Sequence, residues 1–318
     1  MNCYLGIDIG GTKTAYGLFD ESRTLLKREQ TPSNMDADGP TFFSDVADRI
    51  RVLMEEARSL GGSLEGIGIG ITGFVDFERG ALTRSASLPK MNFFRVVDYL
   101  RSALHTEIPI VMDNDCHCGA LAEYRHGAGR GHRHMLYCPV STGISTGIII
   151  DGKLFRGSNG ASGESGHMLS AVQGDARIPC SCGNAGCFNS LGSGKAIISH
   201  VRRWLGQGEE SVLPGLAGGV DCITAEHINA AYELKDPLAE RAVNQMARYL
   251  AMWIFNVYML LNVDCIVFGG GLLKMGDKLF EQMLKEFEEY HTNGFPVHFY
   301  KTELGSDSGL IGAVELLF

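Results

Sequence analysis

Short β-type runs alternate with helical spacings along the whole chain, and this alternation restricts the possible fold more than any other feature. Residues 67–71 form an apolar run spaced by glycines, whereas residues 43–60 place apolar side chains three or four positions apart, as on one face of a helix. A helical spacing at 93–104 precedes an apolar run at 108–112, and a long helical segment at 238–262 precedes another at 265–268. This order is typical of an α/β fold.

Two strand-turn-strand units carry glycines and a hydroxyl residue at their tips. In the first unit, β-rich runs at 4–9 and 15–19 flank a glycine turn, and the second unit at 136–150 contains Ser141, Thr142 and Gly143. Their likeness predicts a duplicated plan in which both tips face one ligand. The alternative is that two glycine-rich hairpins arose without a common plan.

Length and charge narrow the classes of protein. A chain of 318 residues is long enough for two domains that share a cleft. The formal net charge of −9 disfavours nucleic acid as a partner, since no basic run offsets it. The most apolar stretch, 250–261, is too short to cross a membrane, and the chain opens without a secretory signal, so a cytoplasmic protein without a membrane partner is expected. Nine cysteines in such a chain favour free thiols or a metal site over disulfides.

The turn after the first run combines an acid with bare backbone. Asp8 ends the run, Gly10 and Gly11 would let backbone amides approach phosphate oxygens, and Thr12 or Lys13 could contact a phosphate directly. Asp8 could hold a magnesium ion through water. The spacing matches neither a P-loop nor a dinucleotide-binding turn. A plain glycine hairpin, with glycines present only for their conformational freedom, is the alternative.

Three polar residues follow the apolar run at 108–112. Functional groups of open α/β sheets lie at such carboxyl ends of strands, and Asp115 is the candidate general base, with Asn114 beside it to hold a second hydroxyl. Asp115 also precedes a helix-prone segment, so a helix N-cap is the competing interpretation.

A glycine-rich segment places Glu164 and His167 three residues apart, ahead of Cys180, Cys182 and Cys187. Gly183 and Gly186 would supply the tight turns that bring three sulfurs together. Three thiols and one imidazole are the four ligands of a closed, structural zinc site. Three reduced thiols without a metal are the alternative.

Gly269, Gly270 and Gly271 follow the apolar run at 265–268. Bare backbone there would let an adenine or ribose pack closely. The alternative is a loop that needs positive φ angles.

Together these segments resemble the ROK family of sugar kinases, sugar-responsive repressors and related proteins. The resemblance rests on residues 8–14, 114–115, 163–167 and 180–187, and it extends over essentially the whole chain. It implies a two-lobed actin-like ATPase fold, also called ribonuclease H-like, with an interdomain cleft. It also implies a smaller domain at 1–118, against which a C-terminal helix at about 304–318 packs, and a larger domain at 119–303 that carries the zinc motif.

The resemblance further implies an enzyme that transfers the γ-phosphoryl group of ATP to the 6-hydroxyl of a hexose with Mg²⁺ bound, usually as a homodimer. Asp115 is expected to deprotonate that hydroxyl, and Asn114, Glu164, His167 and Asn189 to contact the sugar. Zn²⁺ would be held by His167 and the three cysteines, behind the sugar site. The residues expected on the ATP and magnesium side are Asp8, Gly10, Gly11, Thr12, Lys13, Thr142, Gly143, Gly269, Gly270 and Gly271.

Some positions depart from the family pattern. Asn189 stands where kinases of the family usually have a sugar-binding glutamate, Ser145 and Thr146 replace two glycines of the second tip, and Ser87 replaces an asparagine. The amide at 189 is expected to alter sugar affinity or choice by about 1–2 kcal/mol, the contribution of one charge-assisted hydrogen bond.

Two other classes of function remain as alternatives. A sugar-sensing repressor would need an N-terminal DNA-binding segment, whereas the first hairpin here begins at Tyr4. A sugar-binding protein that has lost catalysis is favoured by Asn189 and disfavoured by the retained Asp8, Asp115 and Glu164. The sequence does not identify the hexose: glucose, fructose, mannose, allose and N-acetylmannosamine all remain open.

Overall fold

The computed structural model describes residues 1–170, 172 and 177–318, and the chain divides into two compact units. Unit 1 comprises Met1–Tyr137, Gly147–Gly163 and Thr302–Phe318, and unit 2 comprises Cys138–Thr146 and Glu164–Lys301. The domain boundary expected after residue 118 lies inside helix α3 (Asp115–His126) of unit 1. That boundary, as one between domains that fold independently, stays a prediction.

Unit 1 is built on a five-stranded sheet with the order β3-β2-β1-β4-β7. Its strands are β1 (Asn2–Ile9), β2 (Lys13–Asp20), β3 (Leu25–Pro32), β4 (Ser63–Ile71) and β7 (Ile110–Asn114). β1 pairs antiparallel with β2 and parallel with β4, which in turn pairs parallel with β7. The predicted strands are therefore present. β3 was not expected because it is polar, as suits an edge strand that is exposed along one side.

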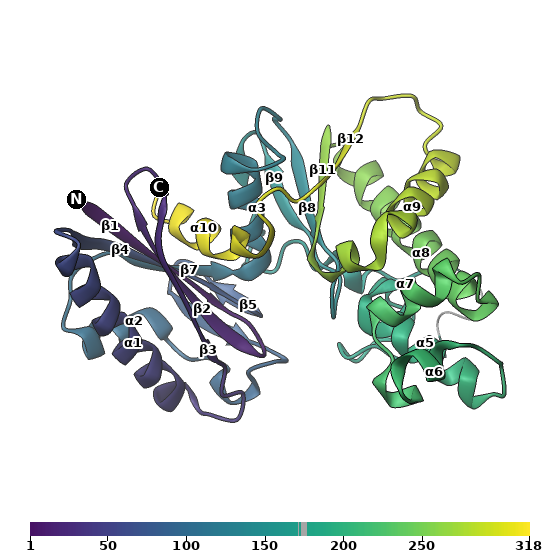
Figure 1. Ribbon diagram of the computed structural model, residues 1–318. Helices are drawn as coiled ribbons and strands as arrows, with labels where there is room; N and C mark the ends of the chain where they lie inside the picture. Colours follow the sequence, from purple (N-terminus) through teal and green to yellow (C-terminus); the bar gives the residue numbers. More distant parts are fainter. Residues whose placement is uncertain (171, 173–176) are drawn as a thin grey trace. The chain divides into compact units, whose positions relative to one another are not determined.

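The two faces of this sheet are buried by different means. Large apolar side chains on one face of β1 and β4 pack against helices α1 (Gly39–Ser59) and α2 (Val96–Leu104): Leu5, Ile7, Ile9, Ile67, Ile69 and Ile71. Gly6, Gly66 and Gly68 line the opposite face, where α10 (Ser308–Glu315) lies (Figure 1). The period of two along the strands thus places side chains on one face and room for a closely packed helix on the other.

Helix α2 begins later than the helical spacing predicted. The sequence pattern suggested a start at Phe93, but the helix begins at Val96. Phe93 has a positive φ of 61° and a side chain that is 82% exposed, because it lies in the turn that follows the short helix η1 (Pro89–Met91).

The second sheet has the order β10-β9-β8-β11-β12, and the division between the units falls within β8. Its strands are β8 (Met135–Pro139), β9 (Gly147–Ile150), β10 (Lys153–Leu154), β11 (Cys265–Gly269) and β12 (His298–Lys301). β8 and β9 form the second predicted hairpin, with Tyr137 opposite Gly147. A small third sheet contains β5 (Phe74–Asp76) and β6 (Ala81–Arg84).

The long helix α8 (Pro237–Leu261) runs through the core of unit 2 and buries Trp253 and Tyr258. The predicted buried segment 250–261 is correct up to Tyr258, after which Met259 and Leu260 are exposed. No helix in the described part of the chain has the length and apolar composition needed to cross a membrane. The other helices of the unit are η2 (Ser165–His167), α4 (Phe188–Gly192), α5 (Gly194–Gly206), α6 (Leu213–Ala217), η4 (Val220–Cys222), α7 (Ala225–Glu233), η5 (Gly270–Met275) and α9 (Gly276–Tyr290), and η6 (Gly305–Asp307) belongs to unit 1.

Candidate functional site

The carboxyl ends of three parallel strands bring acidic residues together in unit 1. Asp8 of β1 is opposite Gly70 of β4, and Gly70 is opposite Asp113 of β7. Gly70 lets the first turn of α3 approach the strand closely, since a Cβ there would lie 3.7 Å from the Cα of Asp115 and 3.1 Å from the Sγ of Cys118. The strand ends therefore place Asp8 and Asp115 on one side of the sheet edge.

Asp8 and Asp115 both have raised pKa values. Burial is the main cause for Asp8, and the negative charge of Asp115 adds to it, raising the pKa of Asp8 to about 6. Burial likewise raises the pKa of Asp115, against hydrogen bonding by the Cys116 backbone and the nearby His117. Lys13 partly offsets the shift of Asp8. Two enclosed carboxylates beside each other favour a cation or a proton between them.

The N-cap of helix α3 is Asn114, not Asp115 as the competing interpretation proposed. The Asn114 side chain accepts hydrogen bonds from the backbone N–H groups of Cys116 at 2.8 Å and His117 at 3.3 Å. Its Nδ2 donates to the carbonyl of Gly73 at 2.9 Å, which leaves one amide proton for a ligand. Asp115 is the first residue of the helix itself.

A buried polar network that sequence reasoning missed lies directly behind Asp115. Asp113 accepts hydrogen bonds from Asn114 N at 2.7 Å, from His117 Nδ1 at 2.8 Å and from Arg156 Nε at 2.6 Å. Burial raises the pKa of Asp113, but the side chains of His117 and Arg156 outweigh this effect and hold the pKa below its usual value. The Oγ of Ser162 lies 3.3 Å from His117 Nε2. The only sequence signal for this network was the spacing of Asp113 and His117, which are four positions apart in the chain.

The glycines of the first turn are not there for their backbone conformation. Neither Gly10 nor Gly11 has a positive φ, and the nearest neighbours of an added Cβ would be 3.4 Å and 3.6 Å away, respectively. Thr12 and Lys13 are exposed at the tip. The plain-hairpin alternative needed positive φ angles at these glycines, so it loses its main physical reason.

The second turn, residues 140–146, is held tightly within unit 2. Gly194 N donates to Ser141 O at 2.8 Å, and the backbone N–H of Ile144 donates to Asn189 Oδ1 at 2.9 Å. Thr142 is exposed at the tip. Thr146, one of the departures from the family pattern, is 1% exposed and its hydroxyl contacts Ser165 Oγ, so this hydroxyl points into the protein.

The glycine triplet lies against this second turn. Gly270 has a φ of 79°, and a Cβ there would lie 2.7 Å from Val140 O. A Cβ on Gly271 would lie 3.1 Å from Ser141 Oγ. The positive-φ interpretation therefore applies to Gly270, whereas Gly269 and Gly271 have ordinary φ angles.

His167, Cys180, Cys182 and Cys187 form a cluster in which one ligand atom of each lies within 4.8 Å of the others. His167 Nδ1 is 3.5 Å from Cys180 Sγ, and Cys182 Sγ is 3.7 Å from Cys187 Sγ. Gly183 and Gly186 have positive φ angles, so they form the expected tight turns. Three sulfurs and an imidazole nitrogen are a donor set that fits a closed tetrahedral zinc site. The other ring nitrogen of His167 faces Glu164 at 3.8 Å.

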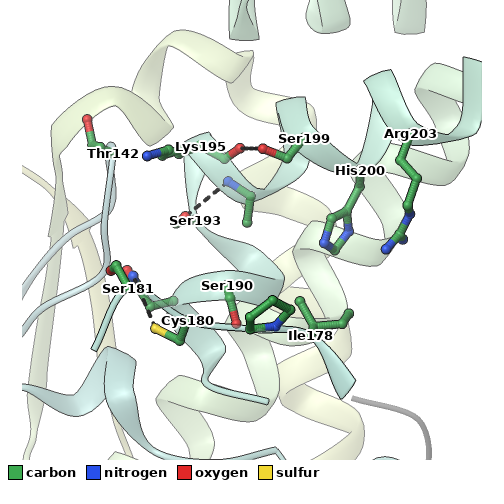
Figure 2. Close-up of a pocket in the computed structure, with 13 residues that line it drawn as sticks. Thr142, Ile178, Cys180, Ser181, Ser190, Ser193, Lys195, Ser199, His200 and Arg203 are labelled. Carbon is green, nitrogen blue, oxygen red and sulfur yellow. Dashed lines mark hydrogen bonds between the residues drawn. The ribbon is translucent and has the colours of Figure 1, made fainter. Parts of the chain in front are cut away.

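Two cavities of unit 2 border the second turn. One of about 350 Å³ is lined by Thr142, Cys180, Asn189, Lys195 and Arg203 among others, and Figure 2 shows Lys195 directed toward Thr142. The other, of about 450 Å³, has a mixed lining that suits a ligand with apolar and anionic parts: Ser141, Thr142, Gly194, Lys195, Ile198, Ser199, Arg202, Thr224, Ala225, Glu226, Met246, Gly271, Lys274 and Met275. Thr142 and Gly271, two of the residues expected on the ATP side, thus line one cavity. Lys195, Arg202 and Lys274 were not anticipated, because isolated basic residues on helices carry no sequence signal.

The structure places the expected residues in two groups. Asp8, the first turn, Asn114 and Asp115 belong to unit 1, whereas Thr142, Gly143, Glu164, His167, the cysteines, Asn189 and the glycine triplet belong to unit 2.

The model of the ROK family matches residues 4–318. The chain belongs to the ROK family.

Curated and solved members of the ROK family match this protein over nearly its full length. A glucokinase from Halalkalibacterium halodurans is 30% identical over 311 residues, which cover 97% of this chain and 93% of that protein. The crystal structure of a ROK family glucokinase from Streptomyces griseus in complex with glucose and AMPPNP is 30% identical, with a TM-score of 0.80 and coverage of 99% and 98%. A xylose repressor from Caldicellulosiruptor bescii is 28% identical, over 94% of this chain and 73% of the repressor. The expected ROK membership and actin-like ATPase fold are therefore confirmed.

Proposed function

We propose that this ROK protein is a kinase that transfers the γ-phosphoryl group of ATP to the 6-hydroxyl of a hexose. The observation that carries the proposal is the pair Asp8 and Asp115 at the carboxyl ends of parallel strands, both with raised pKa values. A carboxylate with a raised pKa is a stronger base than an exposed one, and proton removal by a positioned base contributes about 10²–10⁴-fold in rate. Full-length likeness to glucokinases supports the same reaction class.

Asp115 is the general base in this proposal. It accepts the proton of the attacking hydroxyl, and the network of Asp113, His117 and Arg156 fixes the strand end and the first turn of α3 on which it lies. Asn114, whose oxygen caps that helix, offers its remaining amide proton to a neighbouring hydroxyl of the sugar. Glu164 and His167 contact further hydroxyls.

Asp8 is suited to a magnesium ion that accompanies ATP, because a hard cation prefers carboxylate oxygens and would relieve the repulsion between Asp8 and Asp115. Bound Mg²⁺ would neutralise charge on the phosphates during transfer. Gly10, Gly11, Thr12 and Lys13 bind phosphate oxygens from unit 1. In unit 2 the same role falls to Thr142 and Gly143, and the triplet Gly269–Gly271 would flank the nucleoside, with Gly271 in the lining of the cavity of about 450 Å³.

Zinc held by His167, Cys180, Cys182 and Cys187 has a structural role in this proposal, because four protein ligands leave no open coordination position. The metal would fix the orientation of the His167 ring, and thereby the nitrogen that faces Glu164.

A coupled assay of ADP release over a panel of sugars tests the proposed function. Glucose, fructose, mannose, allose and N-acetylmannosamine are the panel, and the expected result is turnover on at least one of them with Mg²⁺ and ATP. A second candidate, a sugar-binding protein without catalysis, is favoured by Asn189 in place of a glutamate. Sugar binding by calorimetry together with no turnover on any member would overturn the kinase in its favour.

A further inference from the structure

The amide of Asn189 is engaged at both ends within unit 2. Its Oδ1 accepts the hydrogen bond from the Ile144 backbone N–H at 2.9 Å, and its Nδ2 lies 4.0 Å from Cys180 Sγ. A backbone N–H can only donate, so the contact with Ile144 fixes which end of the amide faces the second turn. One acceptor position of the residue expected to contact the sugar is therefore taken by the protein itself.

The second turn is shaped to receive this amide. A Cβ on Gly143 would lie 3.0 Å from Asn189 Oδ1, so the bare backbone at 143 makes room for the Asn189 side chain. The same short segment that carries Asn189 reaches the turn a second time, where Gly194 N donates to Ser141 O at 2.8 Å. Thr142 and Gly143 therefore lie between two residues, Ser141 and Ile144, whose backbones are held by hydrogen bonds to the segment 189–194.

The chemistry of an amide suits this position better than that of a carboxylate. Thr142 and Gly143 carry the turn that, in the proposed function, binds phosphate oxygens. A carboxylate at 189 would place a negative charge directly behind these phosphates, whereas the amide supplies the same acceptor without a charge. The longer side chain of a glutamate would also carry its oxygens one methylene farther from the helix.

We infer that Asn189 is a positioning residue for the second phosphate-binding turn, and that it sets nucleotide affinity rather than sugar affinity. The inference rests on the proposed function for the role of the turn, but not for the hydrogen bond itself. It departs from the expectation that Asn189 contacts the sugar.

Replacement by residues of similar size separates the two roles. Asn189→Leu removes the acceptor, and Asn189→Asp keeps it. Amide hydrogen exchange of Ile144 in the ligand-free protein is expected to be about tenfold faster in the leucine variant and close to wild type in the aspartate variant, since a lost hydrogen bond of ordinary strength corresponds to roughly a factor of ten. The control is Ser190→Ala, because Ser190 is the next residue of α4 and its hydroxyl, among the described residues, bonds to Cys187 O alone, at 2.9 Å.

Ligand binding provides the second readout. The leucine variant is expected to bind an ATP analogue about tenfold more weakly by calorimetry, with the dissociation constant for the sugar within twofold of wild type and, in turnover, a raised KM for ATP at nearly unchanged kcat. A raised dissociation constant for the sugar with unchanged nucleotide binding would overturn the inference, as would unchanged exchange at Ile144. Wild-type protein that binds no nucleotide would contradict the kinase proposal instead, and exchange at Ile144 would still decide the structural role of Asn189.

Discussion

The carboxylates of Asp8 and Asp115 in unit 1 lie in environments that disfavour their ionised forms, which costs stability but suits a role in chemistry. Burial raises the pKa of both Asp8 and Asp115, and the negative charge of Asp115 raises the pKa of Asp8 further, so both hold protons more tightly than exposed aspartates. Asp113, only two residues from Asp115, has the opposite shift because His117 and Arg156 pair with it. Asp113 therefore has a structural role, whereas the carboxyl groups of Asp8 and Asp115 are available to bind a ligand in the proposed function.

Asp115→Asn is expected to abolish turnover while leaving sugar binding nearly intact. The change removes the proposed base but very little volume, so a loss of at least about 10²-fold in kcat follows from the usual contribution of a positioned base. Steady-state kinetics and calorimetry with the best sugar of the panel measure both effects. The matched control is Asp98→Asn on the exposed surface of α2, which should retain wild-type kcat. Near-normal kcat in Asp115→Asn would place the base elsewhere.

Asp8→Asn is expected to stabilise the ligand-free protein at neutral pH. The pKa of about 6 in the folded protein exceeds the ordinary aspartate pKa of 3.8, so ionised Asp8 lowers the free energy of unfolding by about 1–3 kcal/mol above pH 6. As the pH falls from 6 to 4, the folded state takes up the proton first, and the wild-type protein recovers this stability. Urea unfolding at pH 7.5 and at pH 4.5, without ATP or magnesium, should therefore show a large difference between variant and wild type only at the higher pH. Equal differences at both values would mean that the Asp8 carboxyl has an ordinary pKa.

At the scale of elements, the packing of helix α10 on the first sheet depends on a glycine stripe formed by Gly6, Gly66 and Gly68. A Cβ on Gly68 would lie 1.7 Å from Ala313 O, and one on Gly6 would lie 2.3 Å from Leu310 O, so helix α10 contacts the strands backbone to backbone. Helix α3 approaches the same helix, since a Cβ on Gly312 would lie 1.8 Å from Cys118 O. The C-terminal helix therefore helps to fix the helix that begins with Asp115.

Gly68→Ala is expected to destabilise the protein by about 3 kcal/mol, because the added methyl must push α10 away from β4. Chemical denaturation measures the change. Gly206→Ala in α5 serves as the control, since a Cβ there meets nothing within 4 Å and alanine favours a helix by up to about 1 kcal/mol. Similar stability of both variants would show that α10 does not depend on the glycine stripe.

At the scale of the whole molecule, the two units carry different parts of the proposed machinery. The base and the first phosphate turn belong to unit 1, while the second turn, the glycine triplet and the cysteine cluster belong to unit 2. Unit 2 is also the unit in which the short segment 187–194 connects the cysteine cluster to the second turn. A bound zinc ion would therefore stabilise unit 2 locally.

Cys182→Ser is expected to lose bound zinc and to lower the unfolding midpoint by about 4–8 °C, since one of four ligands is removed from a site that contributes to folding. Metal analysis of the purified protein and thermal unfolding provide the two measurements. Cys222→Ser is the matched control, because Cys222 is also an exposed cysteine and lies outside the cluster. Hydrogen exchange should increase around residues 178–194 and stay unchanged in α1. Wild-type protein without zinc, or equal midpoints for the two variants, would leave the cluster as reduced thiols.

The sequence by itself determined the alternation of strands and helices, both glycine hairpins and the composition of the cysteine cluster. These features depend on local spacing: a period of two or 3.6, glycine at turns, and thiols close together in the chain. The family resemblance added which acidic residues to consider, and membership of the ROK family bears that resemblance out.

The tertiary structure decided which of these groups interact across long sequence separations. Arg156 and Ser162 meet Asp113 and His117 only after folding, and α10 meets the glycine face of β4 across more than two hundred residues. The same holds for Asn189, whose amide could be assigned to the second turn only once Ile144 was seen to donate to it. Hydrogen bonds and close backbone approaches of this kind leave no periodic trace in a sequence, because each depends on the geometry of a partner that lies elsewhere in the chain.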